Sequence, residues 1–151
     1  MAELYVDADA CPVKKEIYRV AKRHGMRVTV VANAPVGVPE EDGIAFVLVS
    51  DRFDAADDWI VAHAGERDIV VTDDIPLAAR CLEKGALALG SKGNEFTADS
   101  IGEALANREF SYQLREHGLI DGSGPPYLPK DRSRFLNRLD ILVRRIVNDG
   151  V

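Results

Sequence analysis

The sequence contains three clusters of aspartate whose members could together bind a metal ion. Each cluster follows an apolar run, and the members are Asp7 and Asp9, then Asp54, Asp57 and Asp58, then Asp73 and Asp74. Carboxylates within a few ångströms of one another repel and raise each other's pKa unless a cation neutralises them. Carboxylate oxygens prefer the hard ions Mg²⁺ and Mn²⁺, which activate water and stabilise in-line displacement at phosphorus. We therefore expect an Mg²⁺ or Mn²⁺ site suited to phosphate chemistry.

Capping of helices and turns is the alternative interpretation of each cluster. Asp54 and Asp57 fall in the first turn of an expected helix, where carboxylates complement the helix dipole. Asp74 could be the N-cap of the next helix, and the first cluster could form an Asx-type turn. Capping does not predict, however, that three strands of one parallel sheet would all deliver acids to the same edge.

Strands and helices alternate along the chain and would position the three clusters. The apolar runs predict strands over residues 4–6, 27–32, 44–49, 68–72 and 86–89. Helical spacing and caps predict helices over residues 13–24, 53–64, 75–84, 109–117 and 131–148, and a further helix that ends at residue 106. Residues 90–97 and 118–129 are expected to form loops. This alternation predicts an α/β fold, a three-layer sandwich with a five-stranded, mainly parallel sheet.

Length and apolar content predict a single domain that spans residues 1–151. The chain has 151 residues, of which 46% are hydrophobic, which is enough for a substantial core. Residues 44–49 are almost continuously apolar, so we expect that strand to be covered on both faces. The last helix, 131–148, is expected to pack on the domain through apolar residues on one side, namely Phe135, Leu136, Leu139, Leu142 and Val143.

Several classes of function are disfavoured by the composition and by absent motifs. The net charge of −6 argues against nucleic-acid binding by the whole surface. No apolar run is long enough to cross a membrane, and the first residues lack the pattern of a signal peptide, so a cytoplasmic protein without a membrane partner is expected. No Gly-x-Gly-x-x-Gly or Gly-Lys-Ser/Thr loop follows a strand, so no nucleotide cofactor is expected. Nothing in the sequence indicates an oligomeric state.

Basic and polar residues near the expected site could contact a polyanionic substrate such as RNA. The candidates are Asn33 and Ser50, which follow strands, Lys92 in the loop after the fifth strand, and Lys130, Arg132 and Arg134 at the start of the last helix. An acidic site beside this basic segment could bind a metal and then a nucleic acid. The alternative for the basic segment is a solvated helical face.

Four motifs resemble the bacterial YaiI/YqxD family over nearly the whole chain. They are Asp-Ala-Asp-Ala-Cys-Pro-Val (7–13), Asp-Ala-Ala-Asp-Asp-Trp-Ile (54–60), Val-Val-Thr-Asp-Asp-Ile-Pro-Leu-Ala (70–78), and Gly-Pro-Pro (124–126) followed by Asp-Arg-Ser-Arg-Phe-Leu-Asn-Arg-Leu-Asp (131–140). That family has no established activity and is placed among PIN-like domains, whose better-known members are Mg²⁺/Mn²⁺-dependent ribonucleases and flap nucleases. The resemblance implies a PIN-like domain in which Asp7, Asp57 and Asp73 are catalytic. All seven clustered aspartates, Asp9 and Asp58 included, would be metal ligands.

Three functions remain open from the sequence. The preferred one is a metal-dependent nuclease that cleaves phosphodiesters, most naturally in RNA. A haloacid-dehalogenase-like phosphatase is the second, with Asp7 as nucleophile, Asp9 as acid and Lys84 or Lys92 as its lysine. The third is a non-catalytic module that binds RNA or another partner.

Overall fold

The computed structural model of the protein describes residues 2–9, 11–119 and 126–149. The elements in chain order are β1 (Glu3–Asp7), α1 (Lys14–His24), β2 (Arg27–Ala32), β3 (Ile44–Leu48), α2 (Ala55–His63), β4 (Ile69–Val71), α3 (Ile75–Glu83), β5 (Leu87–Leu89), β6 (Glu95–Phe96), α4 (Ile101–Glu116) and α5 (Pro129–Asp149). Most of the loop expected over residues 118–129, together with part of the Gly-Pro-Pro motif, lies outside the described residues.

The strands form one mainly parallel sheet, which confirms the predicted α/β fold. Their order is β3-β2-β1-β4-β5-β6, and every neighbouring pair is parallel except β5 and β6. The sheet has six strands instead of the five expected, because residues 95–96 pair with β5 inside the segment predicted to be a loop. A strand of two residues is too short to show a period of two.

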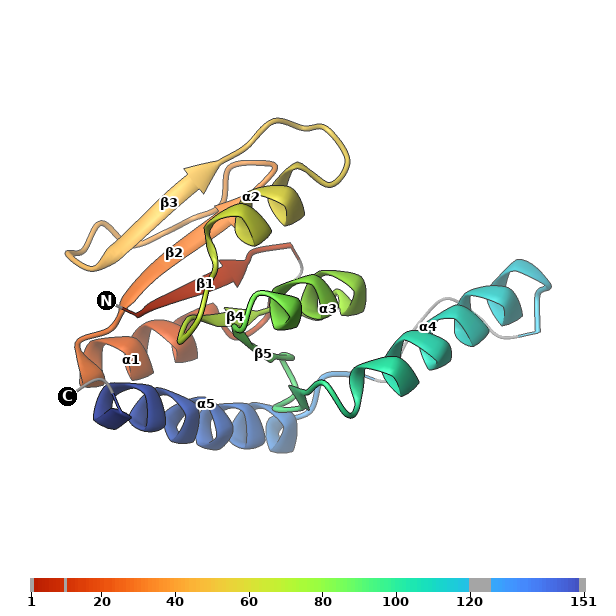
Figure 1. Ribbon diagram of the computed structural model, residues 1–151. Coiled ribbons are helices and arrows are strands. Elements are labelled where there is room, and N and C mark those ends of the chain that lie inside the picture. The colour runs from red at the N-terminus through yellow and green to blue at the C-terminus, as the bar shows by residue number, and fades with distance from the viewer. Residues whose placement is uncertain (1, 10, 120–125, 150–151) are drawn as a thin grey trace.

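Helices cover both faces of the sheet and create a core on each side. In Figure 1, α1 and α5 lie on one side of the sheet, and α2 and α3 lie on the other. The central strand β1 serves both cores, because successive side chains of a strand point to opposite faces. Leu4 and Val6 belong to the core with α1 and α5, whereas Tyr5 belongs to the core with α2 and α3.

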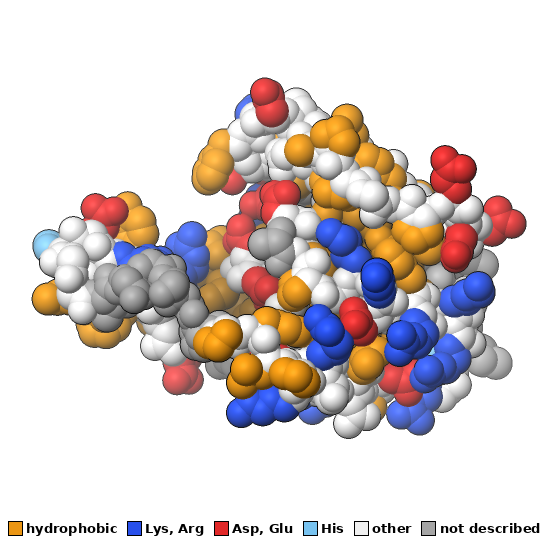
Figure 2. All heavy atoms as spheres, turned by 180° about the vertical axis from the view of Figure 1, so that it is seen from behind, with side chains coloured by type: hydrophobic (Ala, Val, Ile, Leu, Met, Phe, Trp, Pro, Cys, Tyr) orange, Lys and Arg blue, Asp and Glu red, His pale blue; other side chains and the backbone are white. Residues whose placement is uncertain are grey.

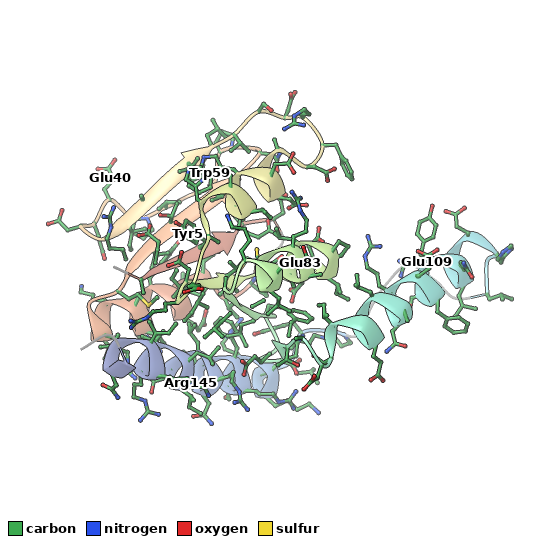
Figure 3. The ribbon with its side chains drawn as sticks, in the orientation of Figure 1. Tyr5, Glu40, Trp59, Glu83, Glu109 and Arg145 are labelled. Carbon is green, nitrogen blue, oxygen red and sulfur yellow. The ribbon has the colours of Figure 1, made fainter. Side chains whose placement is uncertain are left out.

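Aromatic packing fixes α2 against the central strand. The rings of Tyr5 in β1 and Trp59 in α2 meet edge to face, with their centroids 6.0 Å apart, and both are labelled in Figure 3. Such pairs stabilise by about 0.5–1.5 kcal/mol beyond the area that they bury. The contact matters for the site, because α2 also carries two of the clustered aspartates.

The expectation that the third strand is covered on both faces is wrong. β3 pairs with β2 alone among the described strands, and it forms one edge of the sheet. Phe46 and Leu48 are 36% and 53% exposed. A continuous apolar run is typical of a covered strand, but it does not distinguish such a strand from an edge strand with apolar side chains in water.

One long helix replaces the two that were expected between residues 98 and 117. α4 continues through Asn107 and Arg108, neither of which interrupts a helix in the way that glycine or proline does. None of its sixteen residues, all of which are described, is buried. Figure 1 shows α4 extending away from the sheet, whereas α5 lies along α1. Among the described residues, no helix is both long and apolar enough to cross a membrane.

We expect Leu139→Ala to destabilise the protein by about 2–5 kcal/mol, the cost of truncating a fully buried leucine. Leu139 is 0% exposed and lies in the core that α5 shares with α1 and β1. Urea unfolding measures the change. The neighbouring exposed residue provides the control, since Arg138→Ala should change the free energy of unfolding by less than about 0.5 kcal/mol. Equal stability of the two variants would contradict a structural role for α5.

Candidate functional site

A pocket of about 470 Å³ opens at the carboxyl edge of the sheet, beyond the ends of β1 and β4. We call it the acidic pocket, and its lining residues are Asp7, Asp9, Asn33, Asp51, Arg52, Phe53, Asp54, Ala56, Asp57, Asp73 and Asp74. Seven of these eleven described residues are aspartates, and Arg52 is the basic one. In parallel α/β sheets this edge is the usual place for ligands. The structure therefore brings six of the seven predicted metal ligands to one pocket.

Asp7 is the most buried acid of the pocket. It is the last residue of β1 and only 9% exposed, and one of its carboxylate oxygens, Oδ2, accepts a hydrogen bond of 2.8 Å from Thr72 Oγ1. Burial raises the pKa of Asp7 to about 6. The bond from Thr72 opposes this shift, while the nearby charges of Asp9 and Asp74 add to it. Asp7 thus holds an unfavourable negative charge that a cation would neutralise.

Asp54 and Asp57 enter the pocket from the start of α2. Asp54 precedes the helix in the left-handed conformation, with φ at 70°, and among the described residues its side chain makes no capping hydrogen bond. Capping therefore does not account for this carboxylate. Burial raises the pKa of Asp57 to about 6, and the charges of Asp74, Asp7 and Asp54 add to the rise, against Arg80. The charge of the buried Asp7 therefore acts on Asp57, which is partly buried itself.

Asp58 does not line the acidic pocket. Its carboxylate forms ion pairs with Arg80 at 3.0 Å and with Arg52 at 3.3 Å. Consecutive helical residues point about 100° apart, so Asp57 and Asp58 cannot both face one small site. In this arrangement Asp58 links α2 to α3 instead of joining the other acids.

Asp73 and Asp74 follow β4, and each has a structural partner. Asp74 is the N-cap of α3, as the alternative interpretation expected, because its Oδ1 accepts a hydrogen bond of 3.0 Å from Leu77 N. Both oxygens of Asp73 accept from Ser91, at 2.8 Å from its N–H and 2.5 Å from its hydroxyl. Ser91 follows β5, and sequence reasoning missed it because serine in a loop carries no distinctive pattern.

The predicted substrate contacts near the strand ends separate into two places. Asn33 lines the acidic pocket, and its amide donates to the carbonyls of Ser50 at 3.0 Å and Arg52 at 3.3 Å. Asn33 thereby holds the loop that carries Arg52 and Phe53 over the pocket. Ser50 contributes its carbonyl to this bond and does not line the pocket. Lys92 lines a neighbouring groove instead.

The basic residues at the start of α5 lie beside the site but outside the acidic pocket. Arg132 pairs with Glu16 at 3.2 Å, and its guanidinium lies 5.5 Å from the ring centroid of Tyr127. The Tyr127 hydroxyl donates to the carbonyl of Ser91 at 2.7 Å, so this corner of α5 is tied to the partner of Asp73. Arg134 packs on Gly93, where an added Cβ would come within 2.7 Å of Arg134 Cγ. Lys130 is exposed.

The donor set of the pocket fits a hydrated divalent cation. Among the described residues, no group of three or more acidic, histidine or cysteine residues forms a cage that could hold a metal ion. Mg²⁺ does not need such a cage, because it keeps several waters and binds through one or two carboxylates. Asp7 and Asp57 are the best placed for this, since Asp7 is buried, Asp57 is partly buried, and the carboxyl group of each has a raised pKa.

The fold and the pocket define an α/β protein with a parallel sheet and an acid-lined pocket at its carboxyl edge. The family described as "Uncharacterized BCR, YaiI/YqxD family" matches residues 5–145, so the chain belongs to the YaiI/YqxD family. A UPF0178 protein of Rhodospirillum rubrum is 52% identical over 145 residues, 95% of this chain and 97% of that relative. A UPF0178 protein of Parvibaculum lavamentivorans is 53% identical over 146 residues, 97% of this chain and 96% of that relative. The family is uncharacterised, and no solved structure matches the chain significantly.

In the metal-free protein, Asp7 should lower stability as the pH rises. An unfolded aspartate has a pKa of about 3.9, whereas that of Asp7 in the folded protein is about 6. Between these values the folded state binds more protons than the unfolded state, so the free energy of unfolding falls as the pH rises. The Asp7→Asn variant does not lose stability in this way. The difference in free energy of unfolding between the variant and the parent should therefore shift in favour of the variant by roughly 2–3 kcal/mol from about pH 4 to about pH 7.

Urea unfolding in a chelator, repeated across this pH range, measures the difference. Asp42→Asn is the control, because Asp42 is exposed in the loop before β3, at the opposite edge of the sheet. Its effect should stay below about 0.5 kcal/mol at each pH. A stability difference between Asp7→Asn and the parent that does not change with pH would contradict the raised pKa.

Proposed function

We propose that this protein is an Mg²⁺- or Mn²⁺-dependent nuclease that hydrolyses phosphodiester bonds in RNA. The observation that carries the proposal is the convergence of seven aspartates from separate segments on one pocket at the sheet edge. The resemblance of the sequence to PIN-like domains, many of which are metal-dependent nucleases, adds support. A phosphatase finds less support, because Asp54 and Asp57 have no role in that mechanism.

The residues of the pocket have separable roles in this proposal. Asp7 and Asp57 would hold the cation, which when bound activates water and stabilises the charge that develops at phosphorus. Thr72 fixes the orientation of Asp7, since its hydroxyl donates to the carboxylate. Ser91 orients Asp73 in the same way, through both oxygens. Asn33 positions the loop that brings Arg52, a cation suited to contact a phosphate, to the pocket.

The repulsion among the acids explains why a metal would be required. A phosphodiester is negatively charged, and a pocket with seven aspartates and one arginine would repel it in the absence of a cation. A bound divalent ion would reduce the negative charge of the pocket, offer a positive centre to a phosphate oxygen, and lower the pKa of Asp7 and Asp57. Binding of metal and binding of substrate should therefore be coupled.

We expect purified protein with Mn²⁺ or Mg²⁺ to cleave single-stranded RNA, and Asp7→Asn and Asp57→Asn each to reduce the rate at least 100-fold, about 3 kcal/mol in the barrier. Asparagine keeps the size of the side chain but removes the charge that holds the ion. Asp42→Asn should retain the parent rate. Asp58→Asn should also retain most of it, because Asp58 does not line the pocket and pairs with Arg80 and Arg52 instead of joining the other acids.

Mn²⁺ binding, measured by electron paramagnetic resonance, is followed in parallel. A parent that binds neither ion, or that cleaves no RNA in their presence, would contradict the proposal. Retention of RNA without cleavage would favour the binding module. Hydrolysis of phosphomonoesters alone would favour the phosphatase.

A further inference from the structure

A second hollow, of about 530 Å³, adjoins the acidic pocket on the side of α4. We call it the basic groove, and the polar residues that line it include Lys92, Asn94, Asn107, Arg108, Ser111 and Arg115. The loop after β5 provides one wall, and α4 provides the other. Ala104, Arg108, Ser111 and Arg115 follow the helical spacing of four, three and four, so they present one face of α4 to the groove.

The basic groove has the opposite charge to the acidic pocket. Lys92, Arg108 and Arg115 line it, against Asp73 as the acid. None of the ion pairs between described residues engages these three cations. In a chain with a net charge of −6, a polyanion would be attracted locally to such a patch and not to the surface as a whole.

Asp73 connects the two hollows, because it lines both of them. Ser91, which binds both oxygens of Asp73, also lines the basic groove. Figure 2 shows Lys and Arg side chains on the part of α4 that faces the body of the molecule, with acidic side chains gathered nearby. A strand that passes Asp73 would therefore contact the cations of α4 on one side and the acidic pocket on the other.

The lining of the groove suits single-stranded nucleic acid. Arg108 and Arg115 are two helical turns apart, which is about 10.5 Å along α4, so they could contact different phosphates of one strand. Asn94 and Asn107 offer amides for base edges, and Ile75, which is partly exposed, adds apolar surface. Proteins that bind single strands combine cations along the backbone with apolar or aromatic contacts to the bases. Bases inside a duplex would be out of reach of such a hollow.

We propose that the basic groove binds the single-stranded RNA that flanks the scissile phosphate, so that one strand runs from α4 past Asp73 into the acidic pocket. This inference rests on the proposed nuclease function. It assigns Arg108 and Arg115 to substrate binding, so the role of the projecting helix α4 would be to hold the RNA strand. Glu109, labelled in Figure 3, lies in the middle of α4, on the part of the helix that projects away from the sheet.

The test is binding of a short fluorescein-labelled oligouridylate, measured by fluorescence anisotropy with Ca²⁺ in place of Mg²⁺ and Mn²⁺, so that a divalent ion reduces the repulsion by the acidic pocket. Gel electrophoresis checks that the oligonucleotide stays intact during the measurement. The double variant Arg108→Gln/Arg115→Gln should weaken binding at least ten-fold. It should also reduce the slope of log K against log salt by about 1.4, which corresponds to two phosphate contacts on a single strand. Thermal unfolding and Mn²⁺ binding should match those of the parent, since neither arginine lines the acidic pocket.

The control variant removes the same number of positive charges from another part of the surface. Lys22→Gln/Arg145→Gln changes two exposed cations on α1 and α5, outside both hollows, and should alter binding less than about two-fold on the basis of general charge alone. Equal weakening in the two double variants, or unchanged binding in the groove variant, would overturn the assignment. RNA binding through the groove without Mn²⁺ binding would instead contradict the nuclease proposal and leave the groove in place.

Discussion

The acidic pocket depends on the double pairing of β1. This strand is hydrogen-bonded to β2 on one side and to β4 on the other, so Asp7 at its end has little freedom to move away from its neighbours. Thr72, just beyond β4, donates to Asp7, and the start of α2 brings Asp57 toward it. Burial and repulsion make the ionised carboxylates costly where the sheet is most rigid. Strongly perturbed acids that are rigidly held in a cleft are typical of functional sites.

The location of the site could be predicted from the sequence, whereas its finer composition could not. Acids that follow parallel strands must meet at one edge, so the convergence of Asp7, Asp57 and Asp73 follows from topology. The helical spacing rule grouped Asp58 with Asp54, but the arginines that draw Asp58 away come from the loop before α2 and from α3. The pairing of Asp73 with Ser91 depends on how β5 lies beside β4, which no local pattern shows.

The fold was predictable wherever elements were long and flanked by clear breakers. The α/β alternation was correct because α1, α3 and α5 each show one apolar face, and glycine or proline lies at or near the ends of the helices that cover the sheet. The wrong predictions concern the exposure of one strand and the pairing of a very short one. β6 has only two residues, and β3 is an edge strand with apolar side chains in water. α4 lacks a buried face, so no periodic apolar stripe marked its continuity past residue 106.

The position of α5 has a consequence for how the protein is made. It follows every strand of the described residues, yet Phe135 and Leu139 complete the same core as Leu4, Val6 and Ile17. During synthesis the apolar residues of β1 and α1 that pack on α5 therefore stay exposed until α5 leaves the ribosome. Folding that proceeds from the amino end during synthesis cannot complete this side of the sheet before α5 is made. Until then, the nascent chain exposes a hydrophobic surface of the kind that chaperones bind.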